Sequence, residues 1–257
     1  GGTMRLLSGC HPGRVLELIA RERINLTLLV PTMIYTLLDH PELDRTDLSS
    51  LHTLLYGASP MSPTRLVEGL ERIGPVFAQL YGQTEGYPVS FLKRSDHDVA
   101  QPDLFSSCGL PTSGSQVVLL DDDDQPVAPG GVGELCVRSC QVMDGYLNQP
   151  ELTAATLKNG WLHTGDMARA DDRGYFYIVD RKKDMIVTGG FNVYPRDVED
   201  VISSHPAVAM VAVIGVPDAK WGEAVTAMEE CKPGQQVPAE VLTTMVRDRK
   251  GKVYGPK

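Results

Sequence analysis

The sequence predicts an α/β protein whose first part contains a parallel, doubly wound sheet. Short apolar runs typical of strands alternate with segments of helical periodicity over roughly the first 100 residues. After about residue 102 the chain changes to short strands and turns, which predicts a small β-barrel-like subdomain. The last segment again mixes helical and strand patterns, which predicts a compact α+β domain. We therefore expect three parts, residues 1–103, 104–180 and 181–257.

The elements of the first part follow from apolar spacing and from the positions of proline. Val15, Leu16 and Ile19 recur at near-helical spacing. Pro31 suits the first turn of a helix, where its missing N–H would have no partner in any case. Ser62 is a candidate side-chain cap for a helix that begins at Pro63. The expected helices are 12–24, 31–38 and 63–72, and the expected strands are 26–30, 51–55 and 76–80, with a further short strand within residues 1–7.

The later elements are recognised in the same way. Residues 134–138 alternate in polarity, which predicts a half-buried strand. The charged stretch 180–184 (DRKKD) suits a linker between two folded bodies. The remaining expected strands are 116–120, 174–179, 208–216 and 224–228, and the remaining expected helices are 195–204 and 239–249.

Composition excludes several classes of partner. The 257 residues carry a formal net charge of −9, which disfavours nucleic acid or an anionic membrane as the main partner. No apolar run approaches the roughly 18 residues of a membrane helix, and the first residues show no signal pattern, so we expect a cytoplasmic protein without a transmembrane segment. The 5 cysteines form no C-x-x-C pair, which predicts reduced thiols rather than a zinc site.

The stretch 81–86 (YGQTEG) combines unusual chemistry with a turn. The ring of Tyr81 could stack on a flat heterocycle, and Gly82 and Gly86 would let the backbone approach a ligand closely. The Thr84 hydroxyl and the Glu85 carboxylate offer hard oxygens suited to phosphate and Mg²⁺. The alternative is a turn at a strand end whose glycines serve only the backbone.

Two other turns are candidates for binding. Residues 161–166 (WLHTGD) could present the Asp166 carboxylate to a pair of adjacent hydroxyls, such as those of a ribose. An ordinary Asp turn is the alternative. The small-residue turn that begins Gly57-Ala58-Ser59 follows a predicted strand, and ligands bind at the carboxyl ends of strands in parallel sheets.

Taken together, these stretches resemble the adenylate-forming superfamily of acyl-CoA synthetases, luciferases and peptide-synthetase adenylation domains, over nearly the whole chain. Each motif is weak alone, but several in the family's order and spacing make a strong signal. The matching segments are 81–85 (YGQTE), 133–135 (GEL), 145–148 (GYLN), 161–166 (WLHTGD), and 180–184 (DRKKD) with Gly189-Gly190. Residues 187–195 (VTGGFNVYP) resemble medium- or long-chain acyl-CoA ligases more than peptide synthetases.

The resemblance implies a two-step reaction with ATP, Mg²⁺ and coenzyme A. A carboxylate attacks the α-phosphate of ATP to give an acyl-adenylate and pyrophosphate, and the CoA thiolate then displaces AMP. By this likeness Tyr81 stacks on adenine, Thr84 contacts phosphate and Glu85 holds the magnesium ion. Thr84 and Glu85 are the implied catalytic residues. Asp166 and Arg181 would hold the ribose hydroxyls.

The resemblance also implies a larger set of cofactor contacts and a moving domain. Lys183 matches the hinge about which the domain 181–257 swings between the two steps. The implied contacts to adenine, acyl group, nucleotide or pantetheine are Gly57, Ala58, Ser59, Gly82, Ile178, Lys183, Gly189 and Gly190.

Two family features lack a counterpart. The phosphate loop rich in Ser, Thr and Gly is absent, and Lys252 does not match the family's catalytic lysine near the carboxyl end. We therefore expect a carboxyl-terminal half clipped at both ends, inactive by itself, with 1–103 a remnant of the large subdomain. The expected partners are a small-molecule carboxylic acid, expected to be a fatty or similarly apolar acid, with ATP and CoA, and an isolated half could self-associate. An amino-acid or aryl-acid adenylation domain that loads a carrier protein, and a non-catalytic nucleotide-binding remnant, are the alternatives.

Overall fold

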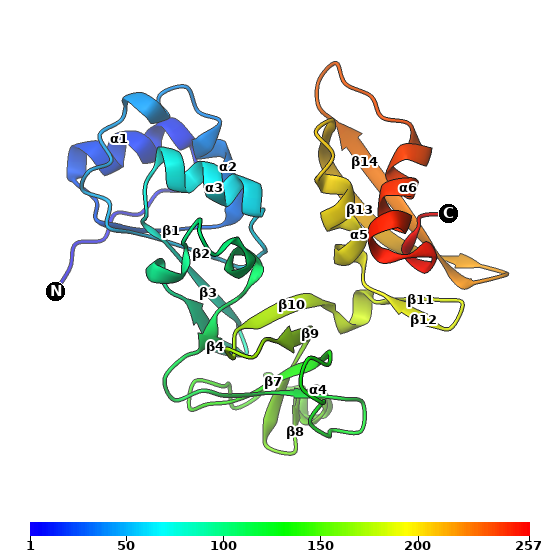
Figure 1. Ribbon diagram of the computed structural model, residues 1–257. Coiled ribbons are helices and arrows are strands. Elements are labelled where there is room, and N and C mark those ends of the chain that lie inside the picture. Colours follow the sequence, from blue (N-terminus) through cyan, green and yellow to red (C-terminus); the bar gives the residue numbers. More distant parts are fainter. The chain divides into compact units, whose positions relative to one another are not determined.

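The computed structural model describes residues 1–257, which divide into two compact units (Figure 1). The first unit contains Gly1–Val118, Cys136–Thr164 and Ala170–Tyr177. The second contains Leu119–Leu135, Gly165–Arg169 and Ile178–Lys257. Both units therefore take residues from the β-rich middle of the chain.

The first unit holds a 5-stranded sheet in the order β1-β2-β3-β4-β5. Its elements are α1 (Pro12–Glu22), β1 (Leu26–Leu29), α2 (Pro31–Leu38), β2 (Thr53–Gly57), α3 (Pro63–Arg72), β3 (Phe77–Gln83), β4 (Gly86–Leu92) and β5 (Leu110–Pro111). The α/β class and the bounds of α2 and α3 are confirmed. Residues 1–7, by contrast, form no strand.

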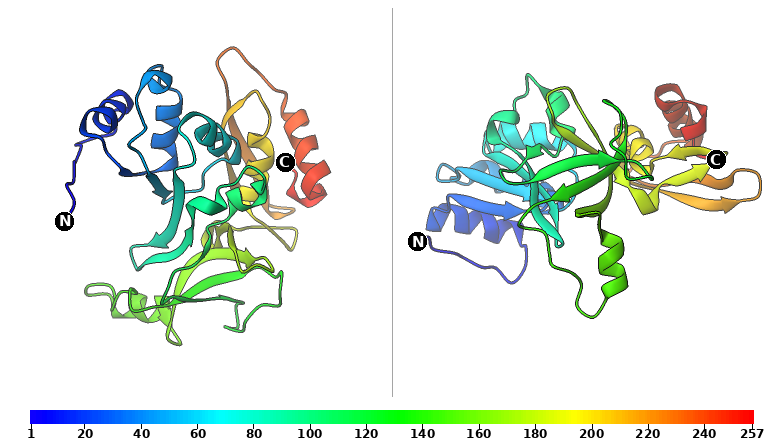
Figure 2. Two further views of the ribbon diagram at one scale, coloured as in Figure 1. Left: turned by 60° about the vertical axis from the view of Figure 1, so that its left-hand side comes forward. Right: turned by 90° about the horizontal axis from the view of Figure 1, so that it is seen from below.

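This sheet is mixed, which corrects the expectation of a parallel, doubly wound sheet. The pairs β1–β2 and β2–β3 are parallel, whereas the pairs β3–β4 and β4–β5 are antiparallel. The order β1-β2-β3 advances in one direction, so right-handed crossovers place α2 and α3 over the same face. Figures 1 and 2 show α1, α2 and α3 together on that face. On β1, Leu26 and Leu28 are exposed.

One hydrophobic core joins these helices to the sheet. Strand residues Leu54, Tyr56 and Phe77 are almost fully buried against helix residues such as Ile34 and Leu66. The strand side chains in this core come from the face that the helices cover, as the period of two in a strand requires.

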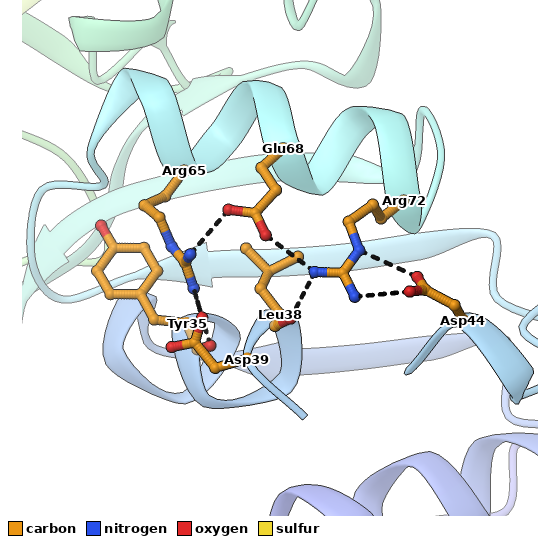
Figure 3. A network of polar contacts seen from close by, with 7 residues as sticks. All are labelled: Tyr35, Leu38, Asp39, Asp44, Arg65, Glu68 and Arg72. Carbon is orange, nitrogen blue, oxygen red and sulfur yellow. Dashed lines mark hydrogen bonds and ion pairs between the residues drawn. The ribbon is translucent and has the colours of Figure 1, made fainter. Parts of the chain in front are cut away.

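Helix α3 is also held to α2 and to the segment after it by charged side chains (Figure 3). The Glu68 carboxylate accepts a hydrogen bond of 2.7 Å from Arg65 and one of 2.9 Å from Arg72. The other acceptors for these guanidinium groups are Asp39, Asp44 and the carbonyl oxygens of Tyr35 and Leu38. Ser62 makes no side-chain cap at α3, contrary to expectation. Its backbone N–H instead donates to the Tyr35 hydroxyl at 2.7 Å.

The middle of the chain forms an open sheet of order β10-β9-β7-β6, with β8 paired to β9. Its elements are β6 (Gln116–Leu120), β7 (Gly133–Arg138), α4 (Pro150–Thr156), β8 (Leu157–Lys158), β9 (Trp161–Ala170) and β10 (Phe176–Arg181). No closed barrel forms, because β6 and β10 remain at opposite edges. Strand β7 is buried from Gly133 through Val137, so the expected alternation of buried and exposed residues is wrong here.

The end of the chain is an α+β module with a 4-stranded sheet of order β12-β11-β14-β13. Its elements are β11 (Ile186–Thr188), β12 (Phe191–Val193), α5 (Pro195–Ser203), β13 (Val208–Asp218), β14 (Gly222–Cys231) and α6 (Ala239–Lys250). Residues of both helices and of the sheet share one core, in which Val198, Val225 and Val246 are fully buried. None of the helices combines the length and apolar character that a membrane crossing requires.

Candidate functional site

The register of β2 on β3 brings two predicted site segments together in the first unit. Gly57, the last residue of β2, pairs with Leu80, which directly precedes Tyr81. A Cβ at Gly57 would lie 2.3 Å from the Leu80 carbonyl oxygen, so only glycine fits. Ala58 follows with φ of +68°, a left-handed conformation that costs a non-glycine residue about 1–2 kcal/mol. The turn formed by Ala58 and Ser59 is exposed.

The segment around Tyr81 is a β-hairpin rather than a loop after a strand. Strand β3 continues through Gln83, which pairs with Gly86, and Thr84 and Glu85 form the turn between them. A Cβ at Gly82 would lie 2.6 Å from Tyr87 Cδ2, so the ring of the same hairpin fills that space. Glycine at position 82 is therefore explained by packing within the hairpin.

Glu85 is fixed from a distant part of the sequence. The Tyr146 hydroxyl donates to Glu85 Oε1 at 2.7 Å, and the Met143 N–H donates to the Glu85 carbonyl at 2.8 Å. The hydrogen bond to Glu85 raises the pKa of the Tyr146 phenol. Tyr146 belongs to the GYLN segment, and nothing in that segment predicts its contact with Glu85.

Glu85 and the exposed Thr84 are adjacent residues of this turn. Tyr146 binds Oε1 of the Glu85 carboxylate. Magnesium ions in phosphate sites are held by one or two carboxylates together with phosphate oxygens and water. The donor set of this turn therefore fits a Mg²⁺ ion bound together with a phosphate group.

The second unit contains the pair formed by Asp166 and Arg181. Asp166 lies in β9 among the buried positions of that strand and is 4% exposed. Arg181 ends β10, and its Nε lies 2.7 Å from Asp166 Oδ1. A buried carboxylate needs a partner of this kind, because an unpaired charge away from water is costly. The guanidinium itself is about half exposed, so the pair can still meet a ligand.

The other predicted residues of the second unit lie on three neighbouring elements. Ile178 is in the middle of β10, and Lys183 is exposed in a short 3-10 helix at Lys182–Asp184. Gly189 and Gly190 form the two-residue turn between β11 and β12, with φ of +59° and +82°. Two successive positive φ angles define the hairpin turn that strongly favours glycine.

Two carboxylates of this unit, Glu134 and Asp180, accept hydrogen bonds from backbone N–H groups near the predicted site residues. The sequence analysis assigned no role to either of them. Glu134 accepts the Gly165 N–H at 3.0 Å and pairs with Lys182 at 3.2 Å. Asp180 accepts the N–H of Arg196, in the first turn of α5, at 2.9 Å. Burial raises the pKa of Asp180. The sequence feature that could have identified Glu134 is a charged residue within an apolar run, as in the segment GEL.

Comparison with protein families assigns the chain. The model of the AMP-binding enzyme family matches residues 1–147, and the model of its C-terminal domain matches residues 197–257. The chain therefore belongs to the AMP-binding enzyme family, as the motifs predicted.

Individual relatives point to enzymes that make acyl-CoA thioesters. The chain is 50% identical to a medium/long-chain-fatty-acid–CoA ligase of Mycobacterium tuberculosis, over 100% of this chain and 46% of that protein. It is 41% identical to a feruloyl-CoA synthase of Amycolatopsis sp., over 100% of this chain and 52% of that protein. The chain thus spans about half the length of the curated relatives it matches.

Solved structures confirm the fold. The amide bond synthetase McbA from Marinactinospora thermotolerans superposes with a TM-score of 0.93 at 40% identity, over 98% of this chain and 51% of that one. MatB from Rhodopseudomonas palustris with bound ATP superposes with a TM-score of 0.89 at 29% identity, over 98% of this chain and 49% of that one.

Proposed function

We propose that the protein containing this chain is an ATP-dependent carboxylic acid:CoA ligase that acts through an acyl-adenylate. The main support is the 50% identity to a medium/long-chain-fatty-acid–CoA ligase over 100% of the chain. The contact between Asp166 and Arg181 agrees with this assignment, because it brings together the carboxylate and the guanidinium that would bind the ribose hydroxyls of ATP.

In the first step, a carboxylate oxygen of the acid attacks the α-phosphorus of ATP, and the bond to the β-phosphate oxygen breaks to release pyrophosphate. Such in-line displacement depends on positioning and charge neutralisation more than on a protein nucleophile. Tyr81 would stack on adenine, and Asp166 and Arg181 would bind the ribose hydroxyls. Thr84 would donate a hydrogen bond from its hydroxyl to a phosphate oxygen.

A magnesium ion bound at Glu85 would supply positive charge to the phosphates. The chain's own contribution is to hold Glu85 in place, its carboxylate through the Tyr146 hydroxyl and its backbone carbonyl through the Met143 N–H. In the turn at the end of β2, Gly57, Ala58 and Ser59 would line the adenine and acyl pocket.

In the second step, the CoA thiolate attacks the acyl carbonyl carbon and AMP leaves. The domain 181–257 would rotate about Lys183 between the steps, as conformational gating does in many enzymes. Gly189 and Gly190 would then approach the pantetheine arm, and Ile178 would contact the nucleotide. We place the reaction in the cytoplasm, where ATP and CoA are available, and keep self-association as a prediction.

The test is ATP-dependent thioester formation by the full-length gene product across a panel of fatty and aryl acids. We expect pyrophosphate release and a CoA thioester with a medium- or long-chain fatty acid. Transfer to a phosphopantetheinylated carrier protein and none to free CoA would favour an adenylation domain instead. Absence of pyrophosphate release with every acid would contradict ligase activity.

Aryl-acid activation is the second candidate, favoured by the 41% identity to a feruloyl-CoA synthase over 100% of the chain. It predicts a clear preference for hydroxycinnamic acids over fatty acids in the same panel. The chemistry and the nucleotide contacts would be unchanged, because the two candidates differ only in the acid.

A further inference from the structure

Glu134 is a buried carboxylate that the proposed reaction does not use. It lies in β7 and is 7% exposed. Its Oε1 accepts the Gly165 N–H at 3.0 Å, and its Oε2 lies 3.2 Å from Lys182 Nζ. A carboxylate with so little solvent contact is stable only when such partners satisfy both oxygens. Each partner lies directly before or after a member of the pair Asp166–Arg181.

The bond to Gly165 acts on the backbone that directs Asp166. Gly165 has φ of +71°, and a Cβ there would meet no atom within 4 Å. Glycine is therefore required by the left-handed conformation and not by crowding. Because Glu134 holds the N–H of this residue, it fixes the peptide that immediately precedes Asp166.

The ion pair with Lys182 acts on the other partner. Lys182 is held between Glu134 at 3.2 Å and Asp122 at 2.8 Å, and the hydrogen bond with Asp122 and the charge of Glu134 raise the pKa of Lys182. Arg181 has extended backbone angles, φ −82° and ψ 136°. Lys182 begins the short 3-10 helix that directly follows β10. The ion pairs of Lys182 therefore hold the backbone immediately after Arg181.

We propose that Glu134 is a positioning residue for ribose recognition, which holds Asp166 through Gly165 and Arg181 through Lys182. The proposal rests on the proposed function, since it assumes that Asp166 and Arg181 bind the ribose of ATP. Glu134 itself touches no substrate. Substitution of Glu134 should therefore change the affinity only for ligands that have ribose hydroxyls.

The test compares ATP with 2′,3′-dideoxy-ATP, measured by isothermal titration calorimetry on the full-length gene product. Glu134→Gln keeps an oxygen that can accept the Gly165 N–H but loses the charge that attracts Lys182. Glu134→Ala loses both. The matched control is Asp123→Asn, which neutralises an exposed carboxylate next to Asp122 in the same turn and leaves both ion pairs of Lys182 in place.

We expect the wild-type protein to bind ATP at least about tenfold more tightly than the dideoxy analogue, because hydrogen bonds to charged groups are strong. This preference should fall in Glu134→Gln and fall further in Glu134→Ala, while affinity for the dideoxy analogue stays within about twofold. The control should keep the wild-type preference.

Two results would overturn the inference while leaving the proposed function intact. One is an unchanged preference in both Glu134 variants, and the other is a parallel loss for both nucleotides together with a lower melting temperature. Wild-type protein that binds neither nucleotide would contradict the proposed function and, with it, this inference.

Discussion

The Tyr146 hydroxyl donates a hydrogen bond of 2.7 Å to the Glu85 carboxylate, across 61 residues of sequence. The two residues come from separate family motifs, YGQTE and GYLN. The contact gives the second motif a physical role, which is to fix the carboxylate that we propose as the magnesium ligand.

Tyr146→Phe should therefore weaken metal binding without removing the ring. We expect the apparent affinity for Mn²⁺, measured by electron paramagnetic resonance in the presence of ATP, to fall about fivefold, because a hydrogen bond to a charged group is lost. Tyr87→Phe is the matched control, since Tyr87 lies in the same hairpin and is 47% exposed. Equal metal affinity in the two variants would refute the role of Tyr146.

Asp166→Ala should weaken ATP binding by at least about tenfold in the full-length gene product, because both a ribose ligand and the partner of Arg181 are lost. Calorimetric titration with ATP measures this change. Asp172→Ala, at an exposed turn residue, is the control and should bind ATP as the wild type does. Retained ATP affinity in Asp166→Ala would rule out the ribose assignment.

Gly57→Ala should destabilise the first unit, because the new Cβ would lie 2.3 Å from the Leu80 carbonyl oxygen. Strands β2 and β3 must separate to accept it, which we expect to cost about 2–3 kcal/mol in the free energy of unfolding. Urea denaturation measures the loss. Gly9→Ala is the control, since its Cβ would meet only His11 Nε2 at 3.7 Å. A shift no larger than that of the control would contradict the packing argument.

His97 should make stability fall in mild acid. It is 5% exposed, and its Nε2 lies 3.0 Å from the Tyr56 hydroxyl while Nδ1 lies 2.7 Å from the Lys93 carbonyl oxygen. Nδ1–H can therefore donate to Lys93, and Nε2 can accept from Tyr56. Burial lowers the pKa of His97, and the nearby Asp96 opposes this only in part.

A lowered folded pKa means that the unfolded chain binds the proton more readily. Stability is then complete above the unfolded pKa of about 6.5 and is lost as the pH falls below that value. Urea denaturation between about pH 7.5 and about pH 5.5 should show this loss, and His97→Gln should reduce the slope. A slope identical in the two proteins would exclude His97 as its source.

Arg72 should contribute more to stability than an ordinary surface arginine. It joins α3 to Glu68 and Asp44 and also donates to the Leu38 carbonyl at the end of α2, which has no partner within the helix (Figure 3). We expect Arg72→Ala to cost about 1–2 kcal/mol, against less than about 0.5 kcal/mol for Arg45→Ala, whose only ion pair is exposed. Urea denaturation of the two variants measures both effects. Equal losses in the free energy of unfolding would disprove the larger contribution of Arg72.

The sequence by itself determined the local elements and the family. Pro31 and Pro63 set the starts of α2 and α3, and apolar spacing set their lengths, because helix signals are local. The motif residues Tyr81, Glu85 and Asp166 were recognisable for the same reason, since each motif is a short continuous stretch.

Only the tertiary structure decided how strands pair and which side chains meet. Strand β4 was not expected from the sequence, and it pairs antiparallel to β3, so the YGQTE segment is a hairpin. The contacts of Glu85 with Tyr146 and of Glu134 with Gly165 join residues 61 and 31 positions apart. Such contacts depend on strand order and register, which arise from packing of the whole sheet and not from the spacing of residues along the chain.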